Sequence, residues 1–323
     1  MRPSIHAIAL ALVVVAVVPY LVLKLMWLGG STVGVSTPAA VAELQSTRMV
    51  TGNIITIGME LLAVGLAVAL VHPWGRRVPA WLVLGVAAGA TGLLAPILLG
   101  LPLGSLIQLA LQADVRTSGM DNMAPWVFAM NYGGFGLLAI AIAVLLVVYA
   151  RARWGRVLVV PPRRPAGWSI TVGAVGMLPF GAATLWWGAV GAGALGPQGM
   201  EAPAQKTTLV VTGLLALAGW AAPLVGASAR WSQAVWLVTW VGCTTAALQG
   251  PAQLLLANGG EPTPAIVLIA VLATPASCVY GLLVLRRGIR EAGVAFTEAP
   301  VVRPGRAASG LRSATRSTPP AGA

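Results

Sequence analysis

Long apolar runs set the pattern of this chain. Eight of them fall near residues 6–28, 51–72, 79–103, 124–150, 167–193, 207–228, 231–257 and 263–285. A bilayer core about 30 Å thick needs roughly 20 apolar residues in a helix, and each run supplies a stretch of that order. The runs are continuous rather than alternating, which favours helices over a β-barrel. The pattern therefore predicts an all-α fold, a polytopic integral membrane helical bundle of about eight transmembrane helices.

Composition and charge point to the same class. With 58% hydrophobic and 9% charged residues, the chain has too little charge to cover the surface of a soluble domain. A net charge of +12 can indicate a nucleic-acid partner. Here, however, the basic residues flank the apolar runs, as the topology rule for membrane insertion requires. The lipid bilayer is thus the predicted partner, and nucleic acid is not.

The basic residues also predict an orientation. With the N-terminus in the cytoplasm, sixteen arginines fall in cytoplasmic segments and only Arg48, Arg116 and Lys206 fall outside. An even number of spans places both termini in the cytoplasm. The first run continues to Leu28 without a small-residue cleavage site, which predicts an uncleaved span rather than a signal peptide. Eighteen arginines against two lysines suggest a G+C-rich bacterial gene, so the predicted location is a bacterial plasma membrane.

The two halves of the chain resemble each other. At one offset, Pro19, Lys24 and Trp27 of span one align with Pro179, Thr184 and Trp187 of span five. At a second offset, Trp81 and Pro96 of span three align with Trp236 and Pro251 of span seven. Weaker leucine matches align Glu60 with Gly213. Four spans per unit return the chain to its starting side, so the sequence predicts two parallel four-helix repeats related by an axis along the membrane normal.

This repeat divides the chain into four segments. Residues 1–150 form the first four-helix transmembrane repeat and residues 167–290 the second. Between them, residues 151–166 form a basic cytoplasmic linker. Residues 291–323 are rich in Pro, Gly, Ala, Ser and Arg and have no apolar period, which predicts a disordered basic cytoplasmic tail.

Shorter features predict local structure outside and between the spans. Thr37 and Pro38 read as an N-cap and a first helical residue, opening a short outer helix through about Arg48. A second outer segment is expected to lie flat on the interface, because its polar residues share one face: Ser105, Gln108 and Gln112. Small residues are expected to mediate helix contacts, namely Gly85, Gly89, Gly133, Gly134 and Gly136.

Formal charges inside the predicted spans are confined to Lys24 and Glu60. Intramembrane charges are costly and often mark functional sites. Adjacent antiparallel spans would let the lysine side chain reach the carboxylate. The alternative is structural, with Lys24 extending to the interface or Glu60 fixing one helix against another.

Further polar residues lie at the same level. Asn53, Thr56 and Glu60 share one face of the second span, while Tyr20, Lys24 and Trp27 share one face of the first. Asn131 and Tyr132 enter span four near its outer end, and Gln249 and Gln253 lie in the outer half of span seven. The predicted binding residues are those of the first repeat: Lys24, Glu60, Asn53, Thr56, Asn131 and Tyr132. They would line a cavity open to the outside.

No recognisable catalytic constellation accompanies these residues. His6 and His72 lie near span ends, and the sequence has no nucleotide-binding loop and no carboxylate cluster suited to magnesium. We therefore expect no catalytic residues, no metal site and no cofactor. Two functions remain open. One is a transporter- or permease-like carrier of a small-molecule substrate. The other is a non-transporting membrane component, such as a sensor, an immunity protein or a partner subunit of a membrane complex.

Overall fold

The computed structural model describes residues 4–111, 122–197, 200–226, 228–256 and 262–292. Within these ranges the long helices are α1 (Ile5–Leu28), α3 (Thr47–Val71), α4 (Ala80–Ala110), α5 (Pro125–Leu158), α6 (Gly167–Ala189), α7 (Pro203–Ala221), α8 (Ser232–Leu256) and α9 (Pro264–Glu291). The short elements are α2 (Pro38–Leu44) and the 3-10 turns η1 (Pro73–Arg77), η3 (Ala222–Leu224) and η4 (Ala229–Trp231). The predicted all-α class is confirmed for the described part of the chain.

Seven of the long helices are long and apolar enough to cross a membrane. The remaining one, α8, is 25 residues long but is not among these seven, and it carries glutamine and threonine along its length. It packs against α4, α7 and α9. The eight predicted spans thus correspond to eight long helices in the described part of the chain, of which seven meet the length and hydropathy of a membrane span.

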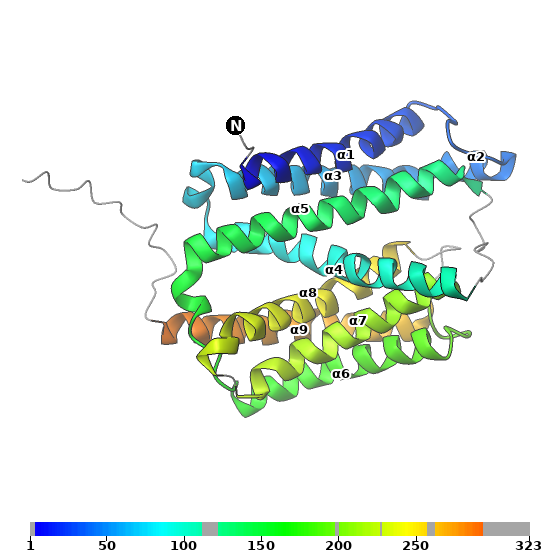
Figure 1. Cartoon of the computed structure of the whole chain (residues 1–323). Helices are drawn as coiled ribbons and strands as arrows, with labels where there is room; N and C mark the ends of the chain where they lie inside the picture. Colours follow the sequence, from blue (N-terminus) through cyan, green and yellow to red (C-terminus); the bar gives the residue numbers. More distant parts are fainter. Residues whose placement is uncertain (1–3, 112–121, 198–199, 227, 257–261, 293–323) are drawn as a thin grey trace, which may run out of the picture.

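The helices form two groups that run side by side (Figure 1). Helices α1, α3 and α5 make the first group and α6 to α9 the second, each with its own hydrophobic core. Helix α4 lies between them, with its first half in the core of the first group and more extensive packing against α7 and α8. Consecutive long helices run in opposite directions, so the start of α1 and the end of α9 lie at the same end of the bundle. That end also holds the α3–α4, α5–α6 and α7–α8 junctions. We call it the basic end, because these segments carry most of the described arginines: Arg76, Arg77, Arg151, Arg153, Arg156, Arg163, Arg164 and Arg230.

The prolines that align between the two halves of the sequence lie inside helices, as the pattern predicted. Pro19 lies within α1 and Pro179 within α6, while Pro96 lies within α4 and Pro251 within α8. A proline removes one backbone hydrogen bond and crowds the preceding turn, so each of these helices has a weakened point at an aligned position. The duplication of the whole unit stays a prediction.

The group boundary is formed by α4, which packs against α7 and α8 as well as against α5. Its buried residues recur every four positions over the second half of the helix: Gly92, Pro96, Gly100, Gly104 and Gln108. A Cβ added at Gly100 would lie 2.7 Å from Thr208 Cα, and one added at Gly104 would lie 2.5 Å from Ala204 Cα. Small residues at this spacing let α4 and α7 approach backbone to backbone.

This packing corrects two predictions. The segment with Ser105, Gln108 and Gln112 was expected to lie flat on the interface, but α4 continues unbroken to Ala110 and buries Gln108; Gln112 lies outside the described residues. The predicted contact glycines Gly85, Gly89, Gly133 and Gly136 have no heavy atom within 4 Å of an added Cβ. Of that set, Gly134 makes the close contact, 2.8 Å from the Ala16 carbonyl oxygen.

Element boundaries differ from the predictions at two other places. The Thr37 side chain caps α2 by accepting a hydrogen bond from Ala40 N, as expected, but α2 ends at Leu44 and Ser46 caps α3. Residues 151–158 of the predicted linker continue α5, with a non-helical residue at Trp154. The predicted disordered tail falls almost entirely on residues 293–323, outside the described residues.

The connection between α1 and α2, residues 29–37, lies at the end of the bundle opposite the basic end, and we call it the strap. The connection from α1 to α2 pairs with the start of α5 through an isolated bridge between Val35 and Met123. Backbone hydrogen bonds flank it, from Ser36 N to Asn122 O at 2.9 Å and from Ala124 N to Gly34 O at 2.8 Å. Gly34 has φ +80°, and an added Cβ would lie 2.6 Å from Val127 Cγ2.

We expect Gly34→Ala to lower the free energy of unfolding by about 2–3 kcal/mol, since it combines left-handed strain with a clash. Gly30→Ala is the matched control, because Gly30 has φ +90° but no heavy atom within 4 Å of an added Cβ. It should cost about 1 kcal/mol, from backbone strain alone. Unfolding of the full-length variants in detergent micelles measures both. Equal losses would show that the strap does not pack on Val127.

Candidate functional site

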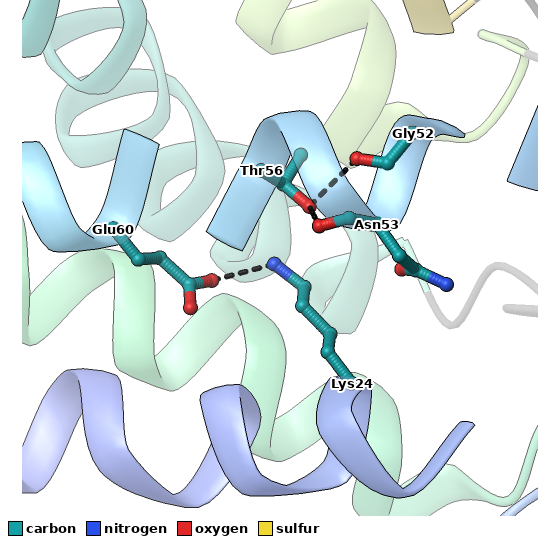
Figure 2. A network of polar contacts seen from close by, with 5 residues as sticks. All are labelled: Lys24, Gly52, Asn53, Thr56 and Glu60. Carbon is teal, nitrogen blue, oxygen red and sulfur yellow. Dashed lines mark hydrogen bonds and ion pairs between the residues drawn. The ribbon is translucent and has the colours of Figure 1, made fainter. Parts of the chain in front are cut away.

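A buried ion pair joins the first two long helices. Lys24 lies near the C-terminal end of α1 and Glu60 in the middle of α3, and the antiparallel packing of these helices brings the two side chains together. Lys24 Nζ donates to Glu60 Oε1 at 2.6 Å, and the side chains are 2% and 6% exposed (Figure 2). The predicted contact between the two charges is therefore present.

The aromatic ring of Tyr20 completes the surroundings of the ammonium group. Lys24 Nζ lies 4.2 Å from the ring centroid, within cation–π range. The ring is held in turn by edge-on contacts with Trp27 and Phe135. Tyr20 precedes Lys24 by one helical turn on the same face of α1, so the sequence spacing already indicated this contact.

The other predicted residues divide into two sets. Asn53 is buried on the same face of α3 as Glu60, and Asn131 lies on α5 one turn from both Val127 and Gly134, the residues of that helix that pack toward α1. Thr56 uses its hydroxyl within its own helix, donating to Gly52 O at 2.9 Å (Figure 2). Tyr132 is 41% exposed.

Hydrogen-bonding capacity remains unused around the pair. Three side-chain atoms are buried and have no hydrogen-bond partner in the described structure: Glu60 Oε2, Asn53 Nδ2 and Asn131 Oδ1. Leaving a buried polar atom unpaired costs about 1–3 kcal/mol, so such atoms call for an explanation. Two acceptors and one donor are thus unused on α3 and α5, and one of the acceptors, Glu60 Oε2, belongs to the neutral charge pair itself.

The predicted open cavity is not present at the pair. Lys24 is 1% exposed and Glu60 5%, so both are sealed between helices in this conformation. On the side away from the basic end they are covered by a cluster of apolar residues: Leu23, Trp27, Leu44 and Val127. Trp27 also donates from Nε1 to Val33 O at 2.8 Å, which fixes the strap over the site. This cover was not predicted, because it depends on a loop pairing between segments almost ninety residues apart.

The corresponding place in the second group is packed shut by small residues. A Cβ added at Gly213 would lie 2.8 Å from Thr184 Oγ1 and 2.6 Å from the Gly181 carbonyl oxygen. Gly213 and Thr184 are the residues that align with Glu60 and Lys24, so the same two aligned positions are neighbours in both groups. In contrast, Gly52, Gly58 and Gly65 of α3 have no heavy atom within 4 Å of an added Cβ. The α6–α7 pair is thus held by close backbone contact and the α1–α3 pair by an ion pair.

The glutamines of α8 belong elsewhere. Gln249 donates from Nε2 to Gly92 O at 2.9 Å and so ties α8 to α4. Gln249 and Gln253 also line a small cavity of about 20 Å³ in the second group, together with Phe180, Thr184 and Trp187. Those three residues align with Tyr20, Lys24 and Trp27. The glutamines therefore contact α4 and the second group rather than Lys24.

No protein-family model, no curated protein and no solved structure matches this chain.

Proposed function

We propose that this membrane protein carries a small solute across the bilayer and that the Lys24–Glu60 pair is its binding site. The observation that supports this is a buried, neutral charge pair with an unpartnered oxygen on Glu60, together with unpartnered buried polar atoms on Asn53 and Asn131. A purely structural ion pair is most stable when its remaining hydrogen-bonding positions are filled. Open positions in an otherwise closed site favour a ligand that fills them.

The difference between the two groups supports the same proposal. The α6–α7 pair is locked by glycine contacts, whereas α1 and α3 are joined mainly through side chains. A charge pair can open when a ligand competes for each partner, but interlocked backbones cannot separate without losing their packing. The second group would therefore serve as the rigid scaffold, and α3 with α1 as the moving part.

A carrier must expose its site to both sides in turn, and this can be measured without knowing the solute. Ala63 lies one turn beyond Glu60 toward the basic end, and Asn53 lies two turns before it; both are buried. In a full-length chain lacking Cys243 and Cys278, we expect a cysteine at either position to react with an impermeant thiol reagent from both membrane faces. Right-side-out and inside-out vesicles separate the two directions.

Ala216→Cys provides the matched control. Ala216 aligns with Ala63 but is fully buried in the core of the second group, so it should remain unlabelled in both vesicle types. Labelling of Ala63→Cys and Asn53→Cys from one face only, or from neither, would contradict the carrier. It would favour the non-transporting component instead.

A further inference from the structure

The chemistry of the site restricts what it can bind. The Lys24 ammonium has three N–H donors, of which one is used by Glu60 Oε1, and Glu60 has a second oxygen that is free. Figure 2 shows the Glu60 side chain leaving α3 toward α1 to meet Lys24 Nζ, whereas the Asn53 amide extends away from the pair. Unused groups of opposite type are therefore present on the pair itself, as the remaining N–H donors of Lys24 and as Glu60 Oε2.

Net charge is the second restriction. The pair is neutral and buried, so a ligand carrying a single charge would leave that charge uncompensated in a low-dielectric interior. A ligand with both a positive and a negative group would instead replace one ion pair by two. Its total charge would be zero, and each protein charge would keep a partner throughout.

We propose that the site takes a small zwitterion with a primary ammonium and a carboxylate, the chemistry of an α-amino acid. The ligand carboxylate would bind Lys24, while its ammonium would bind Glu60 and lie against the face of Tyr20. The flexible four-carbon stem of Lys24 allows the ammonium to withdraw from Glu60 as the ligand enters. This inference rests on the proposed binding site and adds the class of substrate.

The second group provides an internal comparison. Thr184 and Gly213 stand at the aligned positions, and the Thr184 hydroxyl is bonded to Phe180 O at 2.8 Å within its own helix. The neighbouring cavity of about 20 Å³ is lined by uncharged residues. It has no groups that would pair with a separated ammonium and carboxylate, so one zwitterion should bind per chain.

Calorimetric titration of the full-length protein in detergent micelles tests this proposal. The probes are glycine, L-alanine and L-serine, and the single-charge comparisons are acetate and ethylammonium. We expect saturable binding of at least one zwitterion with one site per chain, and binding of acetate and ethylammonium to be about tenfold weaker or absent. Absence of binding by all three zwitterions, or equal binding of acetate, would overturn the inference.

Variants separate the site from general effects on folding. The double variant Lys24→Met/Glu60→Gln should melt near the wild-type temperature and bind no zwitterion, whereas Thr184→Val should bind normally. Retained binding in the double variant would also overturn the inference. Failure of the zwitterion inference is distinguishable from failure of the carrier proposal. Zwitterion binding without two-sided labelling at Ala63 would indicate a receptor, while two-sided labelling without zwitterion binding would show that the substrate class is wrong.

Discussion

Glu60→Gln and Lys24→Met should each lower the free energy of unfolding by about 3–5 kcal/mol, the cost of leaving one member of a buried ion pair without its partner. Lys24 is 1% exposed, so its ammonium cannot regain water without moving the helix. The double variant removes both charges and should recover most of that stability. Chemical unfolding of the full-length protein in micelles measures all three variants, and a double-mutant cycle isolates the coupling.

Labelling of the double variant separates a binding role of the Lys24–Glu60 pair from a purely structural one. We expect the stable double variant to lose two-sided labelling at Ala63, because the charges act in binding as well as in packing. Recovery of both stability and labelling would make the pair structural. Small and additive effects of the single changes would contradict the pairing itself. Lys206→Met is the control, since Lys206 is a partly exposed lysine of the second group and should change stability by less than about 0.5 kcal/mol.

Gly92→Leu should separate the two groups of helices. A Cβ added at Gly92 would lie 2.2 Å from the backbone oxygen of Thr244 in α8, and neither backbone can yield without disturbing its helix. The Gly92 carbonyl also accepts the hydrogen bond from Gln249. We expect a loss of about 3 kcal/mol or more in the free energy of unfolding, at the upper end of the cost of overpacking.

Gly85→Leu controls for the loss of a glycine from the same helix. An added Cβ at Gly85 has no heavy atom within 4 Å, so the leucine would extend into unoccupied space and cost less than about 0.5 kcal/mol. Thermal unfolding of both variants in micelles compares them directly. A Gly92→Leu protein as stable as Gly85→Leu would show that α4 does not cross α8 at this point.

Predicting the spans required only local information. A run of apolar residues and its flanking caps or prolines determine where a helix can cross a bilayer, so the first run predicted at 6–28 became α1 at Ile5–Leu28. The end of α4 was harder to predict. Pro102 and Ser105 resemble a helix end, but the contact of Gly104 with α7 holds the helix together through Ala110. Tertiary packing overrides local propensity there.

The sequence by itself determined that Lys24 and Glu60 are the formal charges within the predicted spans, but it left open whether Lys24 extends to the interface. It also placed Asn53 and Tyr20 on the correct helix faces, since that depends only on the 3.6-residue period. The tertiary structure alone decided that the pair is closed, that Tyr132 is 41% exposed and that Gln249 binds α4. These outcomes depend on how each helix rotates about its axis and on which loops meet. Both are set by side-chain packing between segments distant in sequence, which the hydropathy pattern does not encode.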